Sequence, residues 1–265
     1  VSIADGTVTT ANEVGTVEFD NVTFKYPNAE EALLKNINLK INKGETVAFI
    51  GSTGSGKSTL INLIPRFYDA TEGVVKVDGV DVREFTQAAL HDRIGFVPQK
   101  AVLFNGTVRE NVDFGEKSGH ELTEDGLKKA INIAQATDFV EKMEDGYDAH
   151  IEQGGANLSG GQKQRLSIAR AIARDPEIYI FDDSFSALDY KTDAILREKL
   201  REDTHDATVI MVAQRIGTIK NADKIVVLEN GEMVGVGTHK ELLESCPVYR
   251  EIALSQLSKE ELENV

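Results

Sequence analysis

A glycine-rich turn between a strand and a helix limits the fold of this chain more than any other feature. The residues GSTGSGKST (51–59) fit the pattern G-x-x-x-x-G-K-[ST], follow the strand-like run GETVAFIG (44–51) and lead into the helix-like segment STLINLIPRFY (58–68). Glycines in such a turn let backbone N–H groups point inward around phosphate oxygens, and the helix N-terminus adds the positive end of its dipole. A chance Gly/Ser-rich turn is the alternative, but the flanking strand and helix favour a phosphate-binding loop.

The side chains of this turn favour ATP with Mg²⁺ as the ligand. Lys57 would reach the β- and γ-phosphates, and Ser58 would ligate Mg²⁺. The remainder of the turn is expected to supply further nucleotide contacts, from Thr53, Gly54, Ser55, Gly56 and Thr59.

Two adjacent acids end a later apolar strand. The segment EIYIFD (177–182) closes with Asp182, and Asp183 follows it. Four apolar residues followed by acids place the carboxylates at the carboxyl edge of a buried parallel strand, where ligands of such sheets bind. We expect Asp182 to be the second protein anchor of the Mg²⁺ shell. From this strand alone, the alternative that the two acids merely cap the next segment stays open.

Strand-like and helix-like segments alternate in the second half of the chain. Helices are expected over 162–174 and 190–202, and strands over 177–182, 207–213 and 224–231. Such alternation predicts a largely parallel sheet with helices on both faces. Two shorter strands and an edge-type antiparallel strand are expected earlier: 73–79, 93–99 and TVEFDNVTFKY (16–26).

The predicted fold class is α/β, with a P-loop NTPase core, a mostly parallel sheet, an antiparallel β subdomain and an α-helical insertion. Thr123 and Thr137 would each begin a helix of that insertion, which we place at about residues 100–165. The whole chain then divides into three parts: a linker or N-terminal extension (1–15), a nucleotide-binding domain (16–255) and a C-terminal tail (256–265).

Charge and composition narrow the range of partners. The formal net charge of −15 and the lack of a Lys/Arg cluster with interleaved aromatics argue against a nucleic-acid-binding face. The single cysteine, Cys246, excludes an internal disulfide and suits a reducing compartment. No apolar run approaches the roughly 20 residues that cross a bilayer and no signal peptide opens the chain, so any spanning helices would come from another segment or subunit. The five histidines show no paired metal spacing and are expected at the surface.

The string LSGGQKQRLSIARA (158–171) resembles the signature sequence of ATP-binding-cassette (ABC) proteins. Four more segments match the family's motifs in their order along the chain: FKY (24–26), GSTGSGKST (51–59), VPQ (97–99) and FDDSFSALD (181–189). The chain resembles the nucleotide-binding domain of an exporter-type ABC transporter over nearly all of residues 16–255. This resemblance implies an ATPase at the cytoplasmic face of a cell membrane, coupled to a transmembrane domain.

The signature also has a physical reading of its own. Ser159 is a good N-cap, and Gly160 and Gly161 expose backbone N–H groups at the start of the following helix, which makes an anion site. An ordinary capped helix explains Ser159 but not two successive glycines, which weaken a helix start. The resemblance implies that this turn closes over the γ-phosphate held by a partner domain, through Ser159, Gly160, Gly161, Gln162 and Asp189.

Other roles are implied by the resemblance residue by residue. Tyr26 would stack on adenine, although its alternation with Phe24 leaves a plain core role open. Gln99 would contact Mg²⁺ and link the sheet to the helical insertion. The segment Ser186–Asp189 would cross a dimer interface. Glu152 and Gln153 would touch transmembrane partners, although charge before a turn is usually just solvated surface.

Two positions depart from the pattern of hydrolysing family members. Where those have a glutamate after the metal-binding aspartate and a histidine that bonds the γ-phosphate, this chain has Asp183 and Gln214. Asp183 is one methylene short, and a displacement of about 1 Å in a catalytic group can cost roughly 10²-fold in rate. Gln214 donates a hydrogen bond but carries neither a proton nor a positive charge. We expect tight ATP binding with slow hydrolysis; harmless variation in an active homodimer is the alternative.

The resemblance is to the degenerate-site half of a heterodimeric bacterial multidrug exporter. A second, non-identical nucleotide-binding domain would carry the competent pocket, and the cargo would be drugs or lipids. A regulatory ATP-binding module without useful ATPase activity stays open as a second function class. DNA-repair and chromosome-organising ATPases are a third, but they separate loop and signature by long coiled coils, and the short insertion here lacks sustained heptads.

Overall fold

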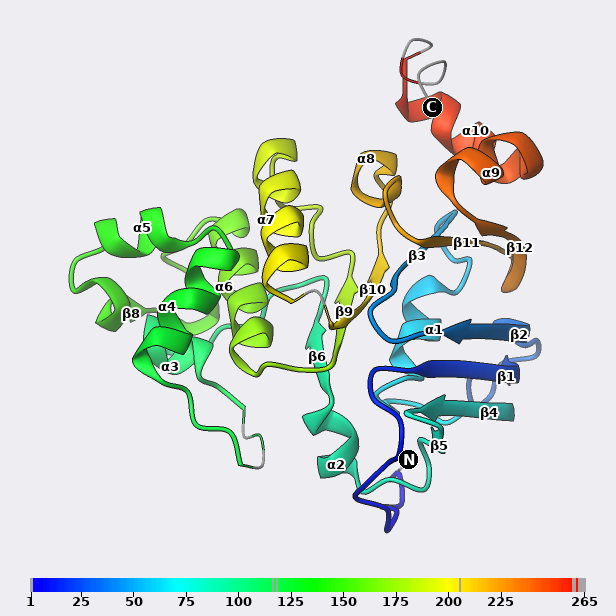
Figure 1. Ribbon diagram of the computed structural model, residues 1–265, viewed down its shortest axis with the longest axis horizontal. Helices are drawn as coiled ribbons and strands as arrows, with labels where there is room; N and C mark the ends of the chain where they lie inside the picture. The colour runs from blue at the N-terminus through cyan, green and yellow to red at the C-terminus, as the bar shows by residue number, and fades with distance from the viewer. Residues whose placement is uncertain (1, 116, 118, 205, 259–260, 262–265) are drawn as a thin grey trace.

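The computed structural model describes residues 2–115, 117, 119–204, 206–258 and 261. It shows a lobe built on β-sheets and a helical lobe beside it (Figure 1). The strands are β1 (Val17–Phe24), β2 (Leu34–Ile41), β3 (Thr46–Gly51), β4 (Glu72–Val77), β5 (Val80–Asp81), β6 (Ile94–Val97), β7 (Gly106–Thr107), β8 (His150–Ile151), β9 (Ile178–Asp182), β10 (Thr208–Val212), β11 (Lys224–Glu229) and β12 (Glu232–Gly237). The helices are α1 (Lys57–Asn62), α2 (Gln87–Asp92), α3 (Val108–Val112), α4 (Glu124–Ile133), α5 (Thr137–Lys142), α6 (Gly160–Ala173), α7 (Tyr190–Asp203), α8 (Ile216–Ile219), α9 (His239–Ser245) and α10 (Pro247–Gln256), with 3₁₀ turns η1 (Gly146–Asp148) and η2 (Gln153–Gly155).

The larger sheet has six strands in the order β12-β11-β3-β10-β9-β6. The strands from β11 to β6 pair in parallel, and β12 adds an antiparallel edge. Both β9 and β10 are buried along nearly their whole length, as expected for parallel strands with helices on both faces. These pairings confirm the prediction of a largely parallel sheet. The prediction was possible because continuous apolar runs mark such strands in the sequence.

The smaller sheet is antiparallel, in the order β2-β1-β4-β5, as predicted for the β subdomain. The expectation that residues 16–26 form an edge strand is wrong, because β1 lies between β2 and β4. Burial alternates along β1, with Val17 and Phe19 buried, which shows that one face of the strand is covered. It does not report whether the strand has one neighbour or two.

Helix α1, which follows the glycine-rich turn, packs between the two sheets. Leu60 and Ile61 of α1 and Ile64 just beyond it are fully buried in a core that takes side chains from both sheets. The helix predicted over 58–68 is too long, because α1 ends at Asn62. Four residues later Arg66 adopts a φ of 60°, in the left-handed region, and the chain turns away.

The opposite face of the six-stranded sheet packs against α6, α7, α8 and the two C-terminal helices in a second core. The helical lobe adds α3, α4 and α5, with α4 lying against α6. Thr123 caps α4 as predicted, since its side chain accepts a hydrogen bond from the N–H of Gly126 (3.0 Å). Thr137 begins α5 as predicted, although Ala136 occupies the N-cap. The two-stranded ladder β7–β8 in this lobe was not predicted.

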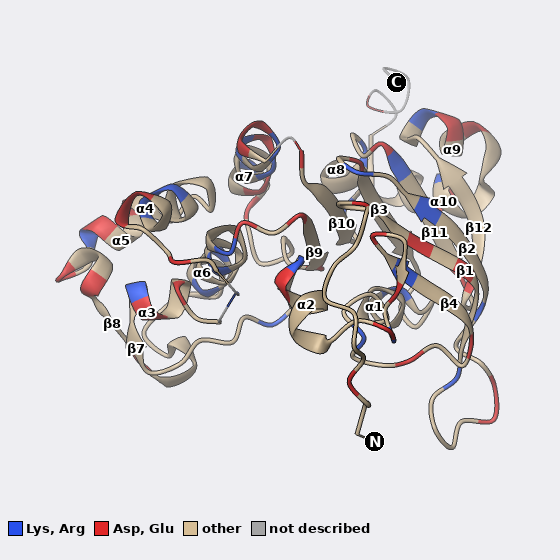
Figure 2. Ribbon diagram, turned by 60° about the horizontal axis from the view of Figure 1, so that its bottom comes forward, with Lys and Arg blue, Asp and Glu red and all other residues tan. Residues whose placement is uncertain are grey.

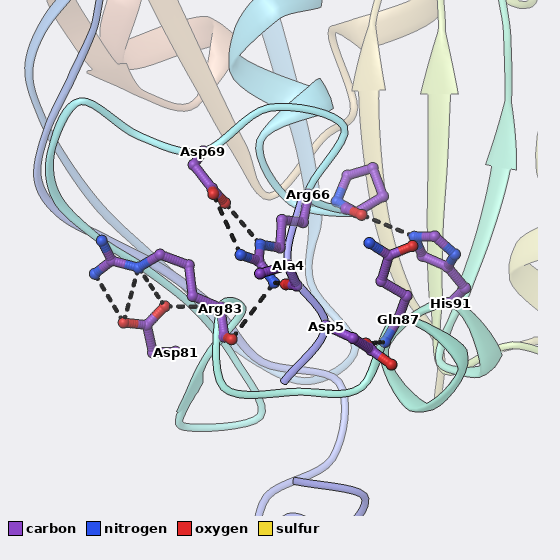
Figure 3. Close-up of polar contacts among 9 residues, drawn as sticks. Ala4, Asp5, Arg66, Asp69, Asp81, Arg83, Gln87 and His91 are labelled. Atoms are coloured by element: carbon purple, nitrogen blue, oxygen red, sulfur yellow. Dashed lines mark hydrogen bonds and ion pairs between the residues drawn. The ribbon is translucent and has the colours of Figure 1, made fainter. Parts of the chain in front are cut away.

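Residues 2–15, predicted as a linker or N-terminal extension, run along the sheet lobe and are tied to it by polar contacts (Figure 3). An Nη of Arg66 donates a hydrogen bond to the carbonyl of Ala4 (2.8 Å). The carboxylate of Asp5 accepts one from the N–H of Gln87, at the start of α2 (2.7 Å). The segment is therefore joined both to the turn after α1 and to the beginning of α2.

Helices α9 and α10 pack beside β12 and α8 near the C-terminal end (Figure 1). Nδ1 of His239 lies 2.5 Å from the hydroxyl of Tyr249, and both side chains are buried. The expectation of a surface position is therefore wrong for His239, and His205 lies outside the described residues. Helix α10 reaches Gln256, the first residue of the predicted C-terminal tail.

Both α4 and α7 carry acidic and basic residues (Figure 2). Within the described part of the chain, no helix combines the length and the apolar character that crossing a bilayer requires.

Candidate nucleotide-binding site

The predicted phosphate-binding loop joins β3 to α1, as the sequence indicated. Gly56 precedes α1 with a φ of 98°, a left-handed value that favours glycine. A Cβ at this position would lie 2.6 Å from Cδ2 of Leu34 in β2. The antiparallel sheet thus closes the turn from behind, while Thr53 and Gly54 lie exposed on its rim.

Lys57 lies at the base of the loop with its ammonium group turned inward. Its Nζ donates hydrogen bonds to the carbonyls of Gly51 (2.5 Å) and Ser52 (3.1 Å). Burial lowers the pKa of Lys57, while the nearby carboxylates of Asp183 and Asp182 act in the opposite direction. The predicted phosphate-binding lysine therefore faces the two predicted acidic residues.

Ser55 provides a test of whether the loop fits a phosphate. Its Oγ is buried and has no hydrogen-bond partner among the described residues. A buried hydroxyl without a partner costs free energy unless a ligand or water satisfies it. An oxyanion in the turn would accept this hydrogen bond, so the loop fits the phosphate group that the sequence predicted.

The predicted metal ligands Ser58 and Asp182 lie together. Oγ of Ser58 donates a hydrogen bond to Oδ1 of Asp182 (2.8 Å), which joins the start of α1 to the end of β9. Burial raises the pKa of Asp182, whereas Ser58 and then Lys57 oppose this shift. Hard oxygen donors of this kind suit Mg²⁺, which usually takes one or two protein ligands and keeps phosphate and water oxygens for the rest. Among the described residues, no group of three or more His, Cys, Asp or Glu side chains is arranged to hold a metal ion.

Asp183 follows β9 in a left-handed conformation, with a φ of 49°. Its N–H donates to the carbonyl of Val212 (2.8 Å), and its Oδ2 accepts a hydrogen bond from Nε2 of Gln99 (3.3 Å). Burial, followed by the charge of Asp182, raises the pKa of Asp183. The structure thus brings the predicted Gln99 to the predicted Asp183, at the edge where β6 and β9 end.

Gln214 lies at the same edge of the sheet. Val212 pairs with Asp182 in the register of β10 and β9, so the residues that follow these two positions leave the sheet side by side. The side chain of Gln214 is exposed, and its backbone carbonyl accepts a hydrogen bond from Nε2 of Gln256 (2.7 Å). The two unusual residues of the sequence, Asp183 and Gln214, therefore follow neighbouring strands.

Tyr26 lies just beyond β1, half-buried beside the loop. Its hydroxyl lies 3.0 Å from Oγ1 of Thr59 in α1. Its ring meets those of Phe24 and Tyr68 edge-on, at centroid distances of 4.8 and 5.4 Å. The structure places Tyr26 at the nucleotide loop and also in an aromatic cluster, so both the adenine and the core roles remain predictions.

The signature turn lies in the helical lobe, at the start of α6, away from α1 (Figure 1). Ser159 caps α6 by accepting a hydrogen bond from the N–H of Gln162 (3.2 Å), whose side chain accepts one from the N–H of Ser159 (3.0 Å). A Cβ at Gly160 would meet nothing within 4 Å, so its backbone is open. The chain does not bring this turn to its own phosphate-binding loop.

The predicted interface segment Ser186–Asp189 lies beside the signature turn. A Cβ at Gly161 would lie 3.3 Å from the carbonyl of Ala187. Asp189 caps α7, because its carboxylate accepts hydrogen bonds from the N–H and the hydroxyl of Thr192 (both 2.8 Å). Glu152 and Gln153 are exposed ahead of α6, and their contact with transmembrane partners stays a prediction.

Sequence reasoning missed Arg215, which holds several of these elements together. Its guanidinium donates to the carbonyls of Leu188 (3.1 Å) and Phe185, and lies 3.4 Å from the carboxylate of Asp193. It also lies over the ring of Tyr190, 4.8 Å from its centroid. A single arginine has no periodic or motif signal of its own; its position directly after Gln214 was the only indication.

Comparison with known proteins gives consistent results at three levels. The family model described as ABC transporter matches residues 34–186. An uncharacterised ABC transporter ATP-binding protein of Mycobacterium tuberculosis is 49% identical over 242 residues, which cover 91% of this chain and 41% of that protein. A Staphylococcus aureus protein named for multidrug export ATP-binding/permease function is 46% identical over 238 residues, covering 90% of this chain and 41% of that protein.

A solved structure of a bacterial Atm1-family ABC exporter with ATP bound has a TM-score of 0.90 and 35% identity, covering 97% of this chain and 45% of that chain. This similarity confirms the predicted α/β fold with its P-loop core. The chain spans about two fifths of the length of the curated relatives that it matches, at 41% in both cases.

Proposed function

Because the chain belongs to the ABC transporter family, we propose that it is the ATP-binding domain of an exporter that dimerises on ATP to drive export across a membrane. Support comes from the Staphylococcus relative, which is named for multidrug export, and from the exporter structure with bound ATP. The proposal places the chain at the cytoplasmic face of a cell membrane. A transmembrane domain, in the same polypeptide or another, would carry the cargo.

The pairing of Ser58 with Asp182 beside Lys57 is the observation that carries this proposal. Lys57 and Ser58 are the first two residues of α1 and Asp182 is the last of β9, and the three side chains converge at one edge of the sheet. Lys57 would hold the β- and γ-phosphates, and Ser58, Asp182 and Gln99 would hold Mg²⁺. When bound, Mg²⁺ would neutralise part of the charge on the phosphate oxygens.

We further propose that this pocket hydrolyses ATP slowly. Asp183 would act on the attacking water, but it is one methylene shorter than glutamate and already accepts a hydrogen bond from Gln99 (3.3 Å). A general base contributes about 10²–10⁴ in rate, and its misplacement by about 1 Å removes roughly 10²-fold. Gln214 adds no proton and no positive charge at the γ-phosphate.

The signature turn would serve a second, non-identical domain. The turn lies at the start of α6, away from the chain's own loop (Figure 1), and a Cβ at Gly161 would lie 3.3 Å from the carbonyl of Ala187 in the segment 186–189. A partner placed head to tail would bring its γ-phosphate to this helix N-terminus. The competent pocket of such a heterodimer would then combine the partner's acidic residue with Ser159, Gly160, Gly161, Gln162 and Asp189 of this chain.

The test is ATP turnover by the purified chain, before and after the double change Asp183→Glu and Gln214→His. We expect slow phosphate release from the unmodified chain and a gain of at least about tenfold afterwards, since both lost functions return. Lys57→Ala in the restored chain is the control, because it removes phosphate binding and should abolish the gain. Rapid phosphate release by the unmodified chain would contradict the proposed weak pocket.

A regulatory ATP-binding module is the second candidate, and Asp183 and Gln214 together favour it. Substitutions in the signature turn distinguish the two candidates when the ATPase rate of the assembled complex is measured. A Cβ at Gly160 would meet nothing within 4 Å, so Gly160→Ala and Gly160→Asp should both fold. The exporter proposal expects a severe loss of the complex's ATPase rate with Gly160→Asp, which repels phosphate, and a smaller loss with Gly160→Ala. An unchanged rate in both would favour the regulatory module.

A further inference from the structure

One side chain of the C-terminal helix holds the loop that carries residue 214. Gln256 is the last residue of α10, and its Nε2 donates a hydrogen bond to the carbonyl of Gln214 (2.7 Å). Its Oε1 accepts one from the N–H of Ile216 (2.8 Å). The amide therefore bridges the backbone on both sides of Arg215, although 42 and 40 residues separate the partners in sequence.

The helix that follows this loop depends on Gln256 for its first hydrogen bond. The first N–H groups of a helix have no partner within the helix, and a side chain at the N-cap usually satisfies one of them. Arg215 is the N-cap of α8 and makes no such bond. Gln256 therefore supplies from another helix the cap that the sequence around α8 lacks.

The loop is fixed from its other side by the core. The guanidinium of Arg215 donates to the carbonyl of Leu188, and it faces Asp193, which is buried. Asp193 also accepts a hydrogen bond from the hydroxyl of Thr218 in α8 (2.8 Å). Between these two attachments, the side chain of Gln214 itself stays exposed at the edge of the nucleotide site.

Helix α10 is itself held firmly enough to act as the support. Tyr249 and Ala253 on its inner face are fully buried, and the Tyr249 hydroxyl lies 2.5 Å from Nδ1 of His239 in α9. Helix α10 also packs against α8. The position of Gln256 is thus set by packing that lies outside the nucleotide site.

We propose that Gln256 is a positioning residue for nucleotide binding: through it, α10 fixes the backbone at residues 214–216 and so directs the side chain of residue 214 at the γ-phosphate. This inference rests on the proposed function, because it requires that Gln214 contacts bound ATP. The C-terminal helix thereby becomes part of the mechanism that distinguishes ATP from ADP. Gln256 acts through Gln214 and touches no nucleotide itself.

The first experiment tests the attachment without nucleotide. Native-state hydrogen exchange is measured at Ile216 in the unmodified chain, in Gln256→Ala and in Ser255→Ala. The hydroxyl of Ser255 donates a local hydrogen bond to the carbonyl of Ile252 (2.6 Å). We expect exchange at Ile216 to be about fivefold faster in Gln256→Ala, the factor that corresponds to one hydrogen bond of ordinary net strength. Exchange at Ile216 that is equal in all three proteins would overturn the proposal.

The second experiment compares affinity for a non-hydrolysable ATP analogue with affinity for ADP. Because residue 214 would reach only the γ-phosphate, Gln256→Ala should weaken binding of the ATP analogue about three- to fivefold and leave ADP binding unchanged, with Ser255→Ala unaffected. An equal loss for both nucleotides, or no loss, overturns the proposal. Lys57→Ala separates failure of the Gln256 proposal from failure of the proposed function. If Lys57→Ala leaves the binding of both nucleotides intact, the proposed nucleotide site is wrong, regardless of the result for Gln256→Ala.

Discussion

Nε2 of Gln99 donates a hydrogen bond to Oδ2 of Asp183, at 3.3 Å. Gln99 lies where the chain leaves β6 toward the helical lobe, and Asp183 lies where it leaves β9, so the contact joins two neighbouring strands at the edge that carries the nucleotide site. The same glutamine is our proposed Mg²⁺ contact. On this proposal, one amide would couple metal binding to the placement of the acid.

Gln99→Ala is expected to weaken Mg²⁺-dependent ATP binding about tenfold, the lower range for loss of a residue that orients a metal site. ATP binding in the presence of EDTA should not change, because Lys57 and the loop remain. Titration calorimetry with and without Mg²⁺ measures both. Lys100→Ala, at the exposed neighbouring position, is the control, and an equal loss with and without Mg²⁺ would exclude the metal role.

Two substitutions at Tyr26 separate its two possible roles. Tyr26→Phe keeps the ring and loses only the contact with Thr59, so ATP affinity should change little. Tyr26→Ala removes a stacking surface worth about 1–3 kcal/mol per base, and ATP affinity should fall at least fivefold. Fluorescence titration measures the affinity and thermal unfolding the stability. A core role alone would lower the unfolding temperature of Tyr26→Ala and leave nucleotide affinity as it was.

At Arg66, substitution by glycine should destabilise the fold less than substitution by alanine. Its buried guanidinium bonds to the carbonyl of Ala4 and to the carboxylate of Asp69 (2.7 Å), so Arg66→Ala should cost about 1–3 kcal/mol in the free energy of unfolding. Its φ of 60° strains any residue except glycine by roughly 1–2 kcal/mol, so Arg66→Gly should be the more stable of the two variants. Denaturant unfolding measures both, and the reverse order would refute the role of backbone strain.

The half-buried carboxylate of Glu177 makes stability depend on pH. Burial, followed by the neighbouring Asp78, raises the pKa of Glu177 to about 8. Oε1 of Glu177 and Oδ2 of Asp78 have no hydrogen-bond partner among the described residues, although Arg93 lies 3.5 Å from Asp78. One proton shared between the two oxygens would satisfy both.

The folded chain therefore keeps a proton that the unfolded chain releases above its ordinary pKa of about 4.3. Stability should fall as pH rises from about 5 to 8 and change little from this cause above that range. Glu177→Gln should flatten the dependence, while Glu198→Gln, an exposed position, should not. Thermal unfolding across this pH range measures the effect; equal slopes for Glu177→Gln and the unmodified chain would contradict it.

The sequence predicted the parallel strands and the edge at which the site lies, because apolar runs mark buried strands and the motifs follow their carboxyl ends. The sequence overestimated the length of α1, because the helix-like pattern of residues continues to Tyr68 whereas the chain turns at Arg66. The contact of Gln256 with Gln214 could not be predicted, because a polar side chain that caps a distant helix has no periodic signal. The roles of the site residues remain predictions until the substitutions above are measured.

Leu34 and Gly56 show how the two sheets share one wall. The methyl group of Leu34 fills the space that a side chain at Gly56 would need, so a β2 residue of the antiparallel subdomain requires glycine in the phosphate turn. A change at either residue would therefore affect both ligand affinity and the packing of the antiparallel subdomain. Any enlargement at one position would demand a matching reduction at the other, which ties the evolution of the pocket to that of a strand with no chemistry of its own.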